Sequence, residues 1–241
     1  MTAATTLLNF NGEGCSFVIS NLEVRVNHNA FNAVLVTLDK GSLTLGNNLY
    51  MSKGSYSMGG LLTANAGTLN LDGVTMSNSF VKWGLIRAYN STTVNLRDCD
   101  IHGISVGETQ SIGSALDLPH GGGVLNVYGG SITNNGITQA SCGQVYCKGT
   151  VNFLGGRPII QDLGVSGATN IRLDGTLDDD ASVGVIYGAA AGDQFGTYVS
   201  GDRMSARAFY PKWSDDPKLR GGTRGTKLVW KTPTGMVLIF K

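Results

Sequence analysis

The sequence predicts an all-β protein, a right-handed parallel β-helix of about six to seven rungs with a small β-rich C-terminal cap. One observation is a repeated pattern, because GTLNLDGVTMSNS at 67–79 returns as GVLNVYGGSITNN at 123–135, with weaker copies beginning at 41, 92 and 149. A second is composition, with 35 glycines in 241 residues and only 15% charged residues. A third is a period near 26, since steps of 26, 25, 31 and 26 residues separate the central polar residues Thr44, Asn70, Asn95, Asn126 and Asn152. Repeats of this length stack to share one core.

Each copy alternates apolar and polar residues, as a β-strand with one buried face does. The apolar positions are predicted to stack as inward ladders, formed by Leu43/Leu45, Leu69/Leu71, Val94/Leu96, Leu125/Val127 and Val151/Phe153. The polar positions are predicted to stack outside as a structural ladder of side-chain amides, not a ligand site, formed by Asn70, Asn95, Asn126 and Asn152. Asn78 and Asn134, at the following corner, are interpreted in the same way.

The chain divides into a predicted β-helix, residues 1–175, and a predicted cap, residues 176–241. The rungs are expected at 5–27, 33–57, 60–80, 84–103, from about 113, and at 144–162, with a partial seventh at 169–177. Beyond them the sequence becomes basic, aromatic and rich in turn residues. KLVWKTPTGMVLIFK at 227–241 predicts a terminal β-hairpin, two alternating strands around Pro-Thr-Gly. A cap is expected because the terminal rung of a solenoid otherwise exposes strand edges and core.

Composition narrows the cofactors and the compartment. No apolar run approaches the 18 or so residues of a membrane span, and the N-terminus carries no signal-peptide pattern. The four cysteines form no C-x-x-C pair and the three histidines are scattered, so neither a metal site nor another cofactor is expected. Cys142 and Cys147 could bridge across a turn, but small buried residues are the favoured interpretation.

Charge is distributed unevenly along the chain. Residues 1–202 hold 9 Lys+Arg and 15 Asp+Glu, a balance of −6, whereas residues 203–241 hold 9 Lys+Arg and 2 Asp, a balance of +7. The basic tail interleaves aromatic residues, which could suit an acidic polymer. Docking on the acidic solenoid, or self-association through this basic cap, is preferred, and no nucleic-acid partner is expected.

One group of side chains has the chemistry of a polysaccharide lyase or hydrolase. Arg97, Asp98, Asp100 and His102 lie on the fourth rung, beside Asp72 on the third. Two carboxylates near a base could cleave a glycosidic bond or bind Ca²⁺. That role requires the acids to converge in a groove, whereas strand alternation predicts an exposed charge cluster. No catalytic residue is therefore assigned.

The repeat spacing also fixes the neighbours of this group. Asp100 is expected beside Thr75 and Ser131, and His102 beside Ser77 and Thr133; these four residues belong to the adjacent rungs. Asp117 and His120, in ALDLPHGGG, are interpreted as turn residues. The glycine run there is not a phosphate loop, because no helix follows it.

The repeats resemble the right-handed β-helix repeats of large bacterial adhesin-like surface proteins. The order of GTVNF, NIRL, ASVGV and a closing GMVLIFK is similar as well, and the likeness covers most of residues 40–241. It implies an extracellular or cell-surface module. Phage structural proteins also use β-helices, so a virion is the alternative location.

The resulting expectation is a non-enzymatic, adhesin-like solenoid that presents a stacked face to a glycan or a host surface protein. Two alternatives remain open. One is a structural subunit of a phage virion, tail or extracellular fibre, assembled through its caps. The other is a polysaccharide lyase or hydrolase.

Overall fold

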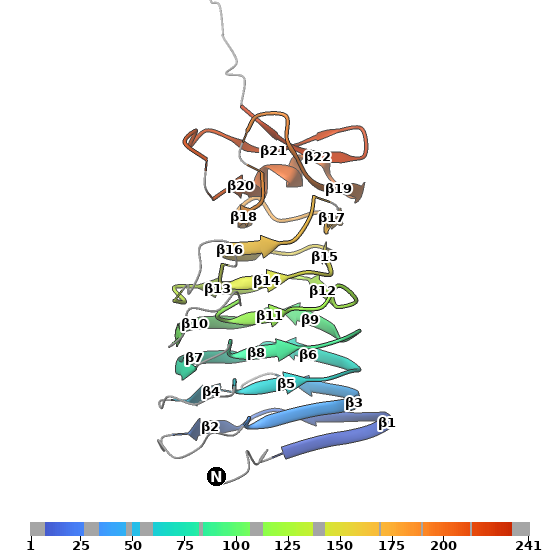
Figure 1. Ribbon diagram of the computed structural model, residues 1–241, viewed down its shortest axis with the longest axis vertical. Helices are drawn as coiled ribbons and strands as arrows, with labels where there is room; N and C mark the ends of the chain where they lie inside the picture. The colour runs from blue at the N-terminus through green and yellow to red at the C-terminus, as the bar shows by residue number, and fades with distance from the viewer. Residues whose placement is uncertain are drawn as a thin grey trace, which may run out of the picture.

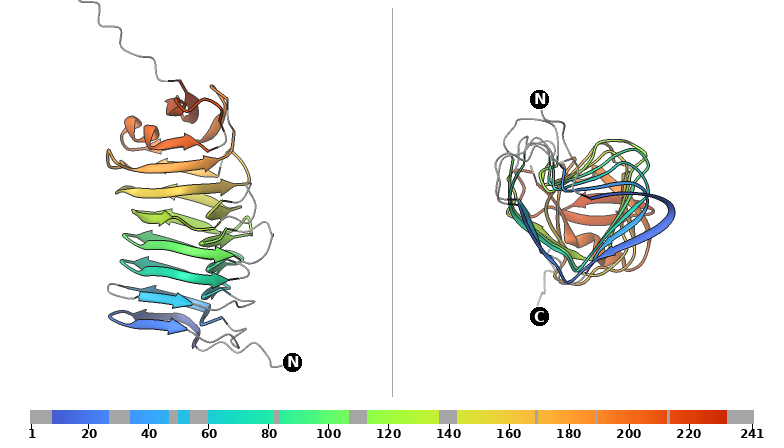
Figure 2. Two further views of the ribbon diagram at one scale, coloured as in Figure 1. Left: turned by 90° about the vertical axis from the view of Figure 1, so that its left-hand side faces the viewer. Right: turned by 90° about the horizontal axis from the view of Figure 1, so that it is seen from below.

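The described residues form a parallel β-helix of about six turns, which confirms the predicted fold class (Figure 1). This computed structural model describes residues 8–26, 34–46, 50–53, 60–81, 84–106, 113–136, 143–168, 170–188, 190–212 and 214–232. Strands dominate, and the one helix among these residues is the short 3-10 helix η1 (Arg203–Ala208). Seen along the stack, successive rungs superpose (Figure 2).

Each rung has three sides, which stack into three parallel sheets. The first face contains β5 (Leu62–Ala64), β8 (Ile86–Ala88), β11 (Leu116–Leu118) and β14 (Val145–Cys147). The second face contains β6 (Thr68–Asp72), β9 (Thr93–Arg97), β12 (Val124–Val127), β15 (Thr150–Phe153) and β17 (Ile171–Asp174). The third face contains β2 (Glu23–Val26), β4 (Tyr50–Lys53), β7 (Thr75–Val81), β10 (Asp100–Val106) and β13 (Gly130–Thr133). Three long strands turn a corner and serve two faces: β1 (Leu8–Ile19), β3 (Val36–Leu45) and β16 (Pro158–Val165).

The repeat sets the register of the second face. Strands β6, β9, β12 and β15 pair in parallel with their central asparagines directly in line. The residues on either side of each asparagine point inward and are buried, which confirms the predicted apolar ladders. Because each rung adds the same apolar positions, one continuous core runs through the stack.

The third face has a bend built on left-handed backbone. Asn78 and Asn134 have φ angles of 48° and 54°, and Gly103, which stacks between them, has φ 67°. Asparagine and glycine adopt this conformation more readily than other residues. The corner asparagines therefore have a backbone role here, and Gly103 interrupts any amide ladder between them.

Parallel pairing continues toward the C-terminus through β18 (Ser182–Ile186) and β20 (Phe209–Pro211). Antiparallel pairing begins where β19 (Gln194–Ser200) meets β22 (Lys227–Lys231). The other edge of β22 pairs with β21 (Arg220–Arg224), so both edges of the predicted KLVWK strand have neighbours. The second strand of the predicted terminal hairpin, at 233–241, lies outside the described residues, and the division at residue 175 stays a prediction.

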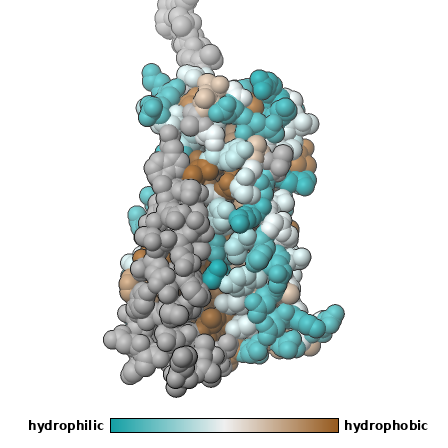
Figure 3. Space-filling view, viewed as in Figure 1, coloured by the Kyte–Doolittle hydropathy of each residue, from teal (hydrophilic) through white to brown (hydrophobic). Residues whose placement is uncertain are grey.

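An aromatic cluster closes the core beneath β21 and β22. Phe195 stacks on Trp230 with ring centroids 3.8 Å apart, and Phe209 meets Phe153 edge-on at 4.9 Å. All four side chains are buried, and the Trp230 indole N–H donates to the Tyr187 carbonyl. On the face seen in Figure 3, many hydrophilic side chains lie at this end of the molecule. Phe209 and Trp230 of the basic segment thus face the core, whereas Arg203, Lys218 and Lys227 are among its exposed cations.

Candidate binding site

The asparagines of the second face form a hydrogen-bonded ladder. The side-chain amide of Asn152 donates to Asn126, Asn126 donates to Asn95, and Asn95 donates to Asn70, at 2.7 to 2.8 Å. Asn70 ends the series by donating to the hydroxyls of Ser42 and Thr44. This geometry is the predicted structural ladder. It fixes the amide planes of Asn70, Asn95 and Asn126, because the Oδ1 of each accepts from the asparagine of the next rung.

A shallow groove lies beside the ladder. Its volume is about 170 Å³, and its polar lining comes from four successive rungs: Thr44, Asn70, Asp72, Asn95, Arg97 and Tyr128. Asp72 and Arg97 are direct neighbours at the ends of β6 and β9. The Arg97 guanidinium lies over the Tyr128 ring, 4.6 Å from its centroid. The groove therefore combines amides, a carboxylate, a guanidinium and an aromatic ring.

The side-chain amides of the ladder have N–H groups and oxygen lone pairs that the ladder itself does not use and that can bind a ligand in the groove. Asn95 uses one N–H on Asn70, and a side-chain amide has two N–H groups and an oxygen with two lone pairs. Arg97 adds exposed donors, and Asp72 adds acceptors. The groove therefore offers a row of amides beside the neighbouring pair Asp72 and Arg97, and the spacing between rungs is roughly 4.8 Å.

The predicted lyase-like group is divided between two faces. Asp72 and Arg97 belong to the groove, whereas Asp98 occupies the corner that follows β9, with φ 47°. Asp100 and His102 lie beyond that corner on the third face. The His102 Nδ1 is 3.2 Å from the Asp100 Oδ2, and both side chains are about half exposed. The corner thus separates the two halves of the group.

The neighbours of Asp100 and His102 are those expected from the repeat. Asp100 pairs with Thr75 and Ser131. His102 pairs with Ser77 and Thr133. Small hydroxyl residues flank both positions, so the side chains remain open to water. The register prediction is confirmed, and Asp100 and His102 make a solvent-exposed contact.

Asp117 is not the turn residue that the sequence suggested. It lies in β11 with a completely buried side chain, and its Oδ2 is 3.3 Å from the Arg87 Nε on the preceding rung. Burial raises the pKa of this carboxyl, although Arg87 opposes the shift. His120 does lie in the exposed turn, against the Tyr89 ring. When GLIRA at 84–88 is aligned with SALDL at 114–118, Arg87 and Asp117 occupy equivalent positions of successive rungs. This alignment indicates their pairing, and the sequence analysis did not use it.

A second buried carboxylate also escaped the sequence analysis. Asp162 is completely buried, and its Oδ1 lies 2.8 Å from the Lys212 Nζ. Its Oδ2 accepts from Gln144, whose oxygen accepts in turn from Asn135. Through Lys212, which follows β20, the network connects the C-terminal segment to the earlier rungs that contain Asp162, Gln144 and Asn135. It provides one direct contact of the expected kind, a cation of the basic segment docked on the solenoid.

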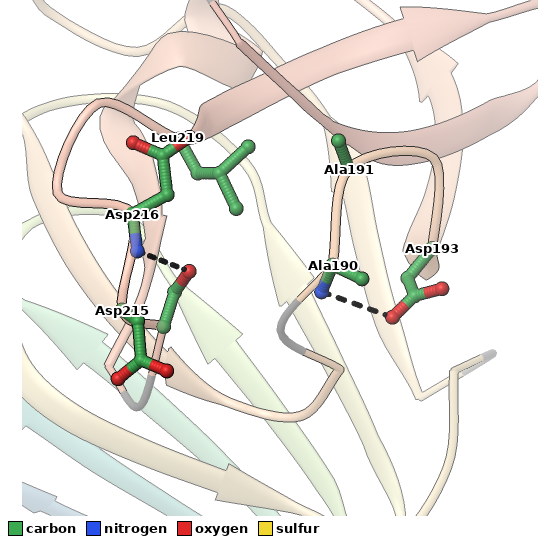
Figure 4. A pocket seen from close by; sticks show the side chains of 7 residues that line it. Ala190, Ala191, Asp193, Asp215, Asp216 and Leu219 are labelled. Atoms are coloured by element: carbon green, nitrogen blue, oxygen red, sulfur yellow. Dashed lines mark hydrogen bonds between the residues drawn. The ribbon is translucent and has the colours of Figure 1, made fainter.

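A larger open cavity of about 450 Å³ lies at the capped end, and two of its three acids have local roles. Figure 4 shows its lining residues, which come from 190–193 and 214–219. Asp193 accepts from the Ala190 backbone N–H, and Asp216 accepts from that of Lys218. These carboxylates stabilise their own turns. The cavity is therefore a gap between two loops and not a further candidate site.

Cysteine and metal chemistry find little support in the described ranges. Cys147 is a buried free thiol, and burial raises its pKa to about 12, while Cys142 lies outside the described residues. Within the described ranges, no three His, Cys, Asp or Glu side chains gather as a metal site would require. The same part of the chain contains no helix with the length and apolar character needed to cross a membrane.

Comparison with known proteins adds no relative. No family model, no curated protein and no solved structure matches this chain.

Proposed function

We propose that this chain is a non-enzymatic, adhesin-like binding module that works at a cell surface or outside the cell and takes a glycan in the groove beside the asparagine ladder. The observation that carries the proposal is the composition of the groove. Sugar hydroxyls both donate and accept, so they match fixed amides that lie beside a carboxylate and a guanidinium. Tyr128 adds an apolar ring edge of the kind that orients ligands in such sites.

The dimensions of the groove favour a shallow contact. A volume of about 170 Å³ lies below the roughly 300–1,000 Å³ of pockets that enclose a drug-sized ligand. Such a site covers one or two sugar units of a longer chain. Repetition of the ladder along the stack would let neighbouring units contact further rungs, as a display surface requires.

The distribution of acids supports binding over catalysis. A glycosidase needs two carboxyl groups across one bond, one of them with a raised pKa. Asp72 and Asp100 lie on different faces, on either side of the Asp98 corner. Asp117, the carboxyl whose pKa burial raises, is enclosed and ion-paired with Arg87. No pair combines access with this chemistry among the described acids.

The binding test uses the purified chain on an array of neutral and acidic glycans, followed by titration calorimetry with each ligand found. Arg97→Ala is expected to weaken binding by about tenfold or more, since it removes a charge-assisted hydrogen bond of roughly 1.5–3 kcal/mol. Arg172→Ala is the matched control, because Arg172 is another exposed arginine two rungs beyond Asn126 on the same face.

Three outcomes would overturn the proposal. The first is an array with no ligand, accompanied by capture of a host surface protein. The second is equal loss of glycan binding in both arginine variants. The third is product release from pectin-like or glycosaminoglycan polymers that Asp98→Ala or Asp100→Ala abolishes, which would make the chain a carbohydrate-active enzyme.

A further inference from the structure

The N-terminal rung presents backbone edges that lack a neighbour within the described residues. Among the described strands, β1 pairs with β3 alone and β2 with β4 alone, each on the side facing the stack (Figure 1). β1 is the longest strand of the protein's described part, with 12 residues. Unpaired strand edges are ready templates for pairing with another chain.

The same rung leaves the end of the core incompletely covered. Its inward positions are apolar, yet each is half-buried or exposed: Leu8, Phe10, Phe17, Ile19 and Val24. The residues that follow them one rung inward are almost completely buried: Val36, Leu38, Leu43, Leu45 and Met51. Leu8 retains 43% of its exposed surface where Val36, its direct neighbour, retains 1%. A partner at this end would bury apolar surface and satisfy strand edges together.

We propose that this end pairs with the same end of a second copy of the chain. The three strands of a rung follow one another in one direction around the solenoid axis. A two-fold axis that lies in the plane of the rung gives the second copy the opposite direction. Every side of one copy then meets a side of the other in antiparallel orientation. An isologous dimer of this kind closes on itself and does not grow further.

The capped end does not offer a matching surface. There β21 and β22 cross the top of the stack, and β22 already has β19 and β21 on its two edges (Figure 1). The three-sided outline of the rungs is lost where these antiparallel strands lie. In a head-to-tail stack, the three free strand edges of the N-terminal rung would lie against the capped end of the next copy. That end does not present three strand edges with which they could pair.

Charge at the third face fits the two-fold arrangement. Glu23 and Arg25 flank Val24 on β2 and pair with each other in the single chain, and more than half of each side chain is exposed, so both can also reach charges of a second copy. An axis through Val24 sets Glu23 opposite Arg25 of the second copy, twice. On the opposite side of the rung, the same axis passes through the corner of β1 at 11–15. Segment 8–10 of one copy therefore lies against segment 16–19 of the second copy. The pairs Glu23–Arg25 are then complementary in both directions.

The charge pattern gives a test with an internal rescue. Glu23→Arg places like charges across the interface, and so does Arg25→Glu; each is expected to weaken dimerisation by about tenfold. The double variant restores the pairs, and an equimolar mixture of the two single variants forms a heterodimer. Sedimentation velocity over a concentration series measures the constants, and circular dichroism verifies that each variant is folded.

Two matched controls separate this end from the other. Arg172→Glu reverses an exposed charge on a remote rung, and Lys227→Glu reverses one at the capped end; neither is expected to change the dimerisation constant. A monomer at all concentrations, an open filament, failure of the double variant to recover, or an effect of Lys227→Glu equal to that of Glu23→Arg would each overturn the proposal.

Cysteine chemistry gives an independent measurement. Cys15 is an exposed thiol in the corner through which the axis passes. Cys99 and Cys147 are buried, and burial raises the pKa of each to about 12, so they react slowly at neutral pH. In a Cys142→Ser background, a short bis-maleimide is expected to give covalent dimers on denaturing electrophoresis, and the further change Cys15→Ser is expected to abolish this cross-link without abolishing the non-covalent dimer. Unchanged cross-linking in Cys15→Ser would contradict this arrangement.

Discussion

The two ends of the solenoid solve one problem in different ways. At the C-terminal end, the stacked pair Phe195 and Trp230 lies beneath β21 and β22 and is completely buried. At the N-terminal end, Phe10 and Phe17 are also in contact, with centroids 4.7 Å apart, but both remain partly exposed. Both ends thus place aromatic rings over the core. Among the described strands, only β21 and β22 at the C-terminal end cover such rings.

This difference shows what a repeat leaves undetermined. Interior rungs are covered by their neighbours, so the repeat alone buries their apolar residues. An end has a neighbour on one side, and its cover must come from sequence outside the repeat or from another molecule. The described part of the chain supplies that cover at the C-terminal end, and we infer a second copy at the other.

The largest expected effect compares one aromatic residue from each end. Phe209→Ala is expected to lower the free energy of unfolding by about 3–5 kcal/mol, because it leaves a cavity in a fully packed cluster. Phe17→Ala removes a ring that already meets water, and about 1–2 kcal/mol is expected. Urea unfolding of dilute, monomeric protein measures both values. Equal losses would show that the two ends are equally covered.

The next effect concerns the ion pair that joins the C-terminal segment to the rungs. Lys212→Met leaves Asp162 buried without its cation, and a loss of about 2–4 kcal/mol is expected, reduced from the value for a fully buried pair because Lys212 is one quarter exposed. Lys227→Met removes an exposed cation of the same C-terminal segment and should change stability by less than about 0.5 kcal/mol. Similar losses in both variants would argue against docking through Asp162.

Repetition made the body of the fold predictable. Identical positions in successive copies determined which residues stack, so the inward ladders, the asparagine ladder and the neighbours of Asp100 and His102 could all be stated from spacing. The ends were less accessible. Both edges of β22 are occupied by β19 and β21, and pairing with β19 depends on how the chain crosses the stack, which alternation along one strand does not reveal.

The candidate site was predictable only in part. Sequence spacing placed Asp72 beside Arg97, but grouped them with Asp100 and His102, because the left-handed turn at Asp98 was not recognised. That turn directs the following strand to another face. Asp117 was missed for a related reason: a polar residue in a turn-rich stretch was interpreted locally, although Arg87 occupies the equivalent position one rung earlier.

The ladder gives a smaller effect, which separates its middle from its end. Asn95→Ala removes a donor to Asn70 and an acceptor for Asn126, and a loss of about 1–2 kcal/mol is expected. Asn152→Ala removes the recorded bond to Asn126, and about half that loss is expected. Thermal and urea unfolding measure both. A larger loss at Asn152 would contradict a ladder that is strongest in the interior.

The smallest effect is a pH dependence in the middle of the stack, away from both ends. Burial raises the pKa of Asp117 in the folded state, so the folded protein binds this proton more tightly than the unfolded chain. The resulting stabilisation is full below the ordinary carboxyl pKa, roughly 3.9, and is lost as the pH rises through the folded value. Asp117→Asn should remove that part of the pH profile of the unfolding free energy. Arg87→Gln should extend the decline to higher pH, because Arg87 opposes the shift. If the loss of stability with rising pH were the same in both variants, a group other than Asp117 would be responsible for it. The Asp117–Arg87 pair in the middle of the stack would then not contribute to the pH dependence of the unfolding free energy.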